Sequence, residues 1–129
     1  MSLRSPLGRV LGTGSAKDGT GHWWAQRVTA VALIPLTLWF FFSLLLLPAL
    51  DYETVRVWLV QPLSSLLVIL LIGVLTYHFY LGTMVIIEDY VHSGSAKVAS
   101  LMLLRFLYVL IGGASILAIL RVAFGSLAP

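Results

Sequence analysis

The sequence predicts an all-α membrane protein whose chain crosses the bilayer three times. Hydrophobic residues make up 60% of its 129 residues and charged residues only 10%, a balance that soluble folds do not show. Charge-free runs extend from Val28 to Leu50 and from Val57 to Ile87, and each exceeds the roughly 20 residues that a helix needs to cross a bilayer. A third apolar run extends from Val98 to Leu120.

The third run is interrupted by Arg105, which leaves only Phe106 to Leu120 without a charge before Arg121 follows. This run can still span the membrane if both arginines extend toward the head groups at opposite ends, as long basic side chains do near helix termini. We therefore expect spans at about 28–50, 60–88 and 98–121, within a membrane domain of residues 28–123.

Outside these spans we expect an extended amino-terminal arm, residues 1–27, and a short carboxyl-terminal tail, residues 124–129. Four basic residues precede the first span: Arg4, Arg9, Lys17 and Arg27. Because lysine and arginine concentrate on cytoplasmic segments, we expect the arm in the cytoplasm and, after three crossings, the tail in the periplasm. The lipid bilayer is thus the first expected partner, and the small net charge of +3 does not suggest nucleic acid.

The most informative residue is His78, because an ionisable group deep inside an apolar span is expected to serve a function. Asp89 comes eleven residues later, so on a continuous helix it falls on the same stripe, roughly 16 Å further along. Gly82 lies on this stripe one turn from the imidazole, and we expect it to leave room for a flat group such as a haem. The alternative is a packed histidine whose ring bonds a neighbouring carbonyl or serine.

The absence of cysteine restricts any redox metal to histidine ligands, since the chain has no thiolate for zinc or an iron–sulfur cluster. A six-coordinate haem needs a second axial ligand. We expect His22 and His92 near the membrane surface, too far from His78 to face it across a porphyrin. The second ligand is therefore expected from another chain.

Arg27 stands at the start of the first span, beside His22, Trp23 and Trp24. These residues fit an interfacial belt of aromatic and basic anchors. Arg27 also fits a second role, because its fork of donors suits a carboxylate such as a haem propionate.

Asp89 and Tyr90 stand at the other end of the His78 stripe. The pair fits a helix terminus that ends in solvent, although the helix dipole disfavours an acid there. A phenol at the water boundary can also donate a hydrogen bond to a quinone carbonyl, while a carboxylate beside it orients the quinone or delivers protons. We therefore expect a quinone site at Tyr90 and Asp89.

Three local features predict details of the helices. Pro35 should bend the first helix, Pro62 fits the first turn of the second, and the small residues from Gly112 to Ser115 should allow close packing of the third. Trp39 and the phenylalanines after it are expected to face lipid, and Asp51 to Arg56 is expected to be an outer loop.

The spacing of His78 to Asp89 and Tyr90, the segment GHWWAQRVTA at residues 21–30 and the three spans resemble the small hydrophobic membrane-anchor (D-type, cytochrome b) subunits of bacterial succinate dehydrogenase. The likeness begins at about Gly21 and is strongest to α-proteobacterial and mitochondrial-like forms. It implies a haem-bearing bundle shared with a larger cytochrome b anchor subunit in the bacterial inner membrane. It also implies a flavoprotein and an iron–sulfur subunit on the cytoplasmic face, with no part of the succinate site in this chain.

The resemblance further implies roles for four residues. His78 matches the axial ligand of a b haem whose other ligand belongs to the larger anchor subunit, and Arg27 matches an arginine near a haem propionate. Tyr90 and Asp89 match residues of the ubiquinone site. No matching role exists for His92, Trp23 and Trp24.

Three other function classes compete with this interpretation. An anchor of a quinol:fumarate reductase would share the architecture, and a non-redox scaffold would use His78 only for packing. The absorbance of a b haem separates the scaffold from the redox anchor. A transporter or channel subunit would need a path of polar groups, and the second span offers few beside His78.

Overall fold

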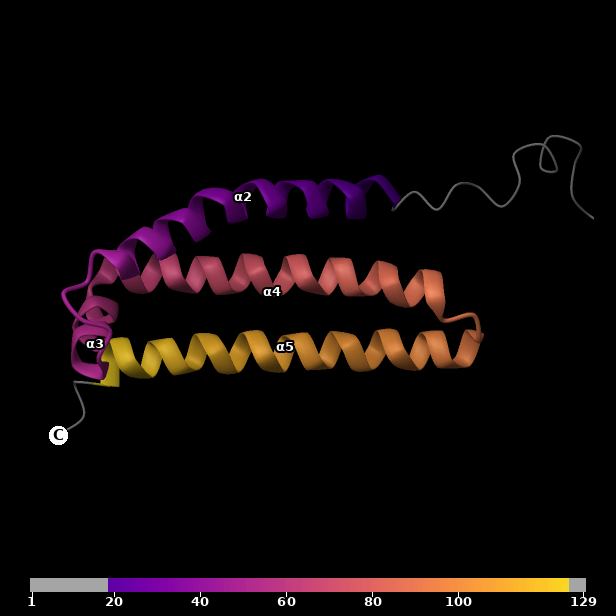
Figure 1. The fold of residues 1–129 in the computed structure, drawn as a ribbon. Coiled ribbons are helices and arrows are strands. Elements are labelled where there is room, and N and C mark those ends of the chain that lie inside the picture. The colour runs from indigo at the N-terminus through magenta and orange to yellow at the C-terminus, as the bar shows by residue number, and fades with distance from the viewer. Residues whose placement is uncertain (1–18, 126–129) are drawn as a thin grey trace, which may run out of the picture.

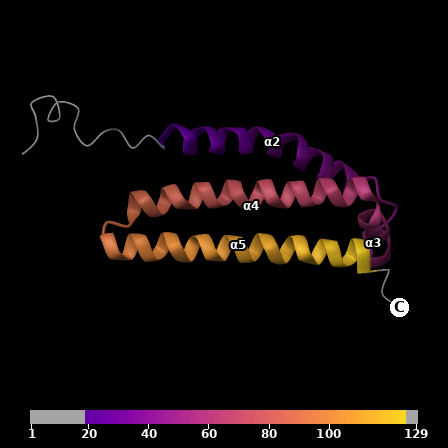
Figure 2. The same ribbon diagram turned by 180° about the vertical axis from the view of Figure 1, so that it is seen from behind.

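The computed structural model describes residues 19–125, which form four helices and no strands, as the sequence predicts for an all-α protein. These helices are α2 (Gly19–Leu45), α3 (Tyr52–Val60), α4 (Pro62–Tyr90) and α5 (Gly94–Phe124). Figures 1 and 2 show the three long helices side by side, with α4 in the middle. Within the described region α4 packs on both α2 and α5, which do not contact each other.

The three long helices are each long and apolar enough to cross a membrane. Their apolar side chains point in all directions around the axes rather than toward one side, which is typical of helices surrounded by lipid. The inside of the layer is correspondingly small, and no described side chain is completely buried.

The helices extend further than the hydropathy of the sequence suggests. Helix α2 already includes residues 19–27, which we expected to be part of the extended arm. The expectation failed there because the charge boundary marks the edge of the apolar run, and backbone hydrogen bonding continues beyond it. Residues 1–18 of the predicted arm and 126–129 of the predicted tail lie outside the described residues.

Helix α3 replaces most of the expected loop between the first two spans. Asp51 caps its first turn, because the Asp51 carboxylate accepts hydrogen bonds from the Thr54 backbone N–H at 2.9 Å and from its hydroxyl at 3.1 Å. The backbone hydrogen bond from Thr54 holds the pKa of Asp51 below its ordinary value. Only Gln61 separates α3 from α4, where Pro62 occupies the expected first turn.

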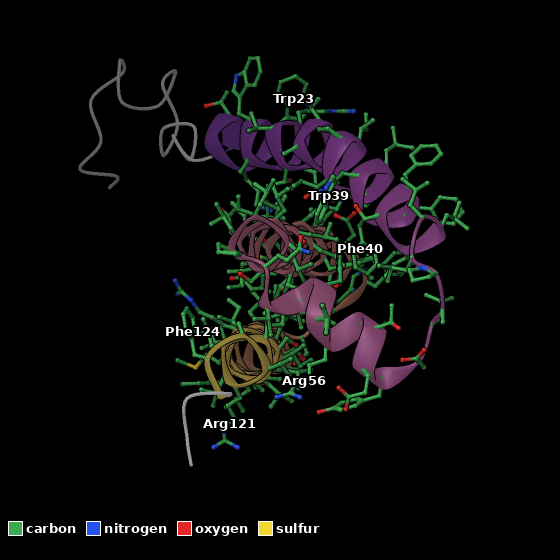
Figure 3. The ribbon with its side chains drawn as sticks, turned by 90° about the vertical axis from the view of Figure 1, so that its left-hand side faces the viewer. Trp23, Trp39, Phe40, Arg56, Arg121 and Phe124 are labelled. Atoms are coloured by element: carbon green, nitrogen blue, oxygen red, sulfur yellow. The ribbon has the colours of Figure 1, made fainter. Side chains whose placement is uncertain are left out.

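Helix α2 contains Pro35 and curves toward α4 in its second half, as Figure 1 shows. The curve brings two aromatic residues of α2 to the end of the molecule where α3 lies (Figure 3). The Trp39 and Phe40 rings have centroids 5.9 and 6.2 Å from that of Trp58 on α3. Phe41 and Phe42 are exposed, as expected of lipid-facing residues. Trp39 and Phe40 are instead half-buried beside Trp58, which the sequence did not show because the tilt of α2 after the proline was not known.

Candidate functional site

His78 faces α2, at the interface between the first and second membrane helices. Its Nδ1 lies 2.9 Å from the hydroxyl oxygen of Thr29. Thr29 is buried and His78 is half-buried, so the imidazole is held between helices rather than exposed to lipid. Among residues 19–125, Nε2 of His78 takes part in no hydrogen bond, and this nitrogen is available to a ligand.

Gly82 does not provide the open space that we expected beside His78. A Cβ atom at this position would lie 3.6 Å from the side-chain nitrogen of Gln26 on α2. This distance is an ordinary van der Waals contact, and it shows that the Gln26 side chain covers the backbone at Gly82. The expectation was wrong because the stripe along α4 does not reveal which neighbouring helix covers it.

Gln26 and Thr29 of α2 meet α4 at Gly82 and His78. His22 lies one turn before Gln26, and the spacing of four and three places the three side chains on one side of α2. Nε2 of His22 and Oε1 of Gln26 are buried without a hydrogen-bond partner among the described residues. Buried polar atoms are nearly always paired, so this row is suited to a polar group from outside the described residues. The helical spacing was a visible signal, but neither Gln26 nor Thr29 was singled out from the sequence.

Arg27 lies on another side of α2. It is two residues from Thr29, which corresponds to about 200° around the helix, and it is exposed. Its guanidinium stacks 5.3 Å from the centroid of Trp23, whose ring meets Trp24 edge to face. The structure therefore does not bring Arg27 to His78, and its pairing with a haem propionate stays a prediction.

Asp89 and Tyr90 form the last turn of α4, which runs without a break from Pro62. This continuity places Asp89 on the His78 stripe, three turns from the imidazole. Both residues are exposed, Tyr90 by 78%. Their side chains are thus open to a ligand or to a neighbouring subunit, and the quinone role stays a prediction.

Two basic side chains satisfy backbone carbonyls where α4 ends. Lys97 Nζ donates to the Glu88 carbonyl at 2.7 Å, and Nδ1 of His92 donates to the Tyr90 carbonyl at 2.9 Å. A cation at this position also offsets the unfavourable dipole that acidic residues meet at a helix carboxyl end. His92, which had no role from the sequence, thus fixes the turn that carries Tyr90.

The interface between α4 and α5 has a different character. The hydroxyls of Thr83 and Tyr108 lie 3.1 Å apart, and buried Gly112 meets Thr76 so closely that a Cβ would lie 3.2 Å from its methyl group. This confirms the predicted close packing at Gly112. Gly113 instead lines an open groove beside Tyr77.

Metal ligands are sparse in the described part of the chain. Residues 19–125 contain no group of three or more histidine, cysteine, aspartate or glutamate side chains able to hold a metal ion.

Comparison with known proteins decides the family. Residues 1–112 match the family described as the succinate dehydrogenase/fumarate reductase transmembrane subunit. The chain belongs to this family. Three similar proteins named as succinate dehydrogenase anchor subunits are the hydrophobic membrane anchor subunits of Paracoccus denitrificans and Rickettsia bellii and the membrane anchor subunit of Reclinomonas americana.

The Paracoccus relative is 34% identical over 98% of both chains. The Rickettsia bellii relative is 38% identical over 69% of this chain and 71% of its own, and the Reclinomonas relative 32% identical over 72% and 80%. No solved structure matches the chain significantly. Membership of this transmembrane-subunit family and the three long apolar helices together make the chain a multi-pass membrane protein.

Proposed function

We propose that the chain is the small membrane-anchor subunit of a bacterial succinate dehydrogenase. In this role it holds the flavoprotein and iron–sulfur subunits at the inner membrane, shares a b haem with a larger anchor subunit and contributes to the ubiquinone site, with its amino terminus in the cytoplasm. One observation carries the proposal. In this chain, which belongs to the family, one ring nitrogen of His78 is hydrogen-bonded between two long helices and the other nitrogen makes no hydrogen bond in the described region.

The chemistry of the donor set fits a shared haem. A neutral imidazole with a free nitrogen is an ordinary axial ligand for haem iron, and His78 supplies such a nitrogen at membrane depth. A haem between two chains needs only one axial ligand from each, and His78 would be the ligand from this chain. When bound, a b haem takes up and gives back one electron at a time.

The unpaired atoms of His22 and Gln26 support the proposal that a partner or cofactor meets the chain near the α2–α4 interface. Both atoms are buried on the α2 side that faces α4, on the same side as Thr29. Leaving a buried polar atom unpaired costs about 1–3 kcal/mol. A partner subunit or a polar edge of the cofactor would remove this cost.

Tyr90 and Asp89 are proposed to take part in quinone reduction. The Tyr90 hydroxyl would donate a hydrogen bond to a quinone carbonyl, and the Asp89 carboxylate would orient the quinone or pass on protons. Their exposure at the end of α4 fits a pocket whose remaining walls come from neighbouring subunits.

The proposal is tested by isolating the complete assembly through this chain in a mild detergent. We expect three companions, a flavoprotein, an iron–sulfur protein and a larger membrane subunit, and a reduced-minus-oxidised difference spectrum of a b haem. An assembly with the companions but no haem band would refute the haem role alone. A chain that isolates without redox companions would refute the anchor function and favour the non-redox scaffold.

A further inference from the structure

We infer that Thr29 is the positioning residue of His78, and that its hydroxyl accepts a hydrogen bond from the Nδ1–H of the imidazole. This bond fixes the ring in the tautomer whose lone pair is on Nε2. The inference rests on the proposed haem role of His78 and adds to it a residue of the first membrane helix.

The direction of the bond follows from the other partners of the Thr29 hydroxyl, which are two backbone carbonyls, that of Ala25 and, at 3.1 Å, that of Gln26. Its hydroxyl oxygen lies 2.7 Å from the Ala25 carbonyl oxygen and 2.9 Å from His78 Nδ1. A carbonyl only accepts, and a threonine hydroxyl has a single proton. Since this proton goes to Ala25, the contact with His78 is a hydrogen bond only if Nδ1 carries the proton and donates it.

Two other threonines in these helices also donate their hydroxyl proton to the backbone carbonyl four residues earlier. Thr37 donates to the Leu33 carbonyl at 2.6 Å, and Thr83 donates to the Phe79 carbonyl at 2.8 Å. Thr83 then has a lone pair for the Tyr108 hydroxyl at 3.1 Å, as Thr29 has for His78. Thr37 is exposed and meets no side-chain partner within residues 19–125.

The tautomer decides which nitrogen can bind a metal. A neutral imidazole has one N–H and one lone pair, so a proton on Nδ1 leaves the lone pair on Nε2. Nε2 is the nitrogen of His78 without a hydrogen bond in the described region. A hydrogen bond from the opposite nitrogen also fixes the orientation of the ring and strengthens it as a donor, an effect on the order of 10–100-fold in metal affinity.

The decisive variant is Thr29→Val in the complete complex, because valine has the shape of threonine without an acceptor. We expect haem to bind about 10–100-fold more weakly and its midpoint potential to rise, since a weaker imidazole donor stabilises ferric iron less. Thr29→Ser keeps a hydroxyl and should restore both properties toward the wild-type values. Thr37→Val removes the same carbonyl bond from the same helix and should change neither.

The outcomes separate this inference from the proposed function. If His78→Ala loses the haem while Thr29→Val keeps wild-type affinity and potential, Thr29 does not position the ligand, although the haem role stands. If His78→Ala keeps an unchanged haem spectrum, the ligand assignment itself fails and the inference falls with it. Should Thr29→Val not assemble, Thr29→Ala is measured instead, and an unchanged potential in that variant overturns the inference.

Discussion

Helix α4 meets its two long neighbours through interfaces that use the same residue types and differ in whether their buried polar side-chain atoms are paired. On the α5 side, the Thr83 hydroxyl meets the Tyr108 hydroxyl, and Gly112 closes against Thr76. On the α2 side, the Thr29 hydroxyl meets His78, but two buried side-chain atoms have no hydrogen-bond partner in the described region: Nε2 of His22 and Oε1 of Gln26.

The difference teaches that the α4–α5 interface is complete in one sense, because its buried polar side-chain atoms are paired even though an open groove lies between the two helices. The buried polar atoms on the α2 side need partners from beyond residues 19–125. Water is scarce at bilayer depth, so an unpaired polar atom there is costly unless a protein or cofactor group satisfies it. The α4–α5 interface meets this demand with its own residues. The α2–α4 interface leaves it unmet, and this is where the proposed ligand His78 lies.

The largest expected effect comes from His78→Ala. Removing the imidazole removes the only proposed iron ligand of this chain, so we expect the purified complex to lose its b-haem absorbance. Thr83→Val is the matched control, because it removes a polar contact of the complete interface and should leave the spectrum unchanged. A haem band that survives in the histidine variant, or disappears in both variants, would contradict the contrast between the two interfaces.

Gly112→Ala tests the packing of the α4–α5 interface by adding a methyl group where the two helices are close. The new methyl group would lie 3.2 Å from the Thr76 methyl, and such overpacking costs about 1–3 kcal/mol. We expect the detergent-solubilised Gly112→Ala complex to melt at a lower temperature than the Gly113→Ala complex, because both variants gain the same helix propensity and only the first displaces Thr76. Gly113→Ala is the control, since a Cβ there meets no atom within 4 Å, and equal destabilisation by both variants would show that the close approach at Gly112 is not responsible.

Tyr90→Phe tests whether the last turn of α4, three turns beyond His78, contributes to a quinone site. Loss of one hydrogen bond to the quinone, worth about 1.4 kcal/mol, predicts roughly tenfold slower quinone reduction. Succinate oxidation with an artificial dye as acceptor should be unaffected. Tyr52→Phe, an exposed tyrosine at the opposite end of the molecule, should leave both rates alone, whereas equal loss of both rates in the Tyr90 variant would indicate impaired docking of the soluble subunits.

The smallest effect is expected at Asp51, which belongs to neither interface. Because hydrogen bonding lowers its pKa in the folded chain, its contribution to stability is present above the unfolded pKa of about 3.9 and is lost as the pH falls through the lower folded value. Asp51→Asn should keep the cap of α3 and remove this acid dependence. Melting temperatures between about pH 3 and about pH 7 measure it, and an acid dependence unchanged in the variant would contradict the assignment.

Features that depend on composition along the chain could be predicted from the sequence. The three spans follow from the apolar runs, the bend of α2 from Pro35, and the depth of His78 from the absence of nearby charges. The helix beginning at Pro62 and the close packing at Gly112 follow in the same way from the properties of proline and glycine.

Features that depend on how each helix is rotated about its axis could not be predicted. Thr29 beside His78, Gln26 over Gly82 and Trp39 against Trp58 all require knowledge of which helix faces which. Helix α3 was missed for another reason: its nine residues are too few to show periodicity, although Asp51 followed by Thr54 was a visible capping signal.

The arrangement of the long helices in one row, with α2 and α5 apart, has a consequence for how the cell must produce this protein. A single row has two broad sides and almost no interior, so residues 19–125 leave two buried polar atoms, on His22 and Gln26, without partners of their own. Copies synthesised in excess of their companions would remain incomplete in the bilayer and open to membrane proteases. Balanced production of the subunits is therefore a requirement that the shape of this chain imposes.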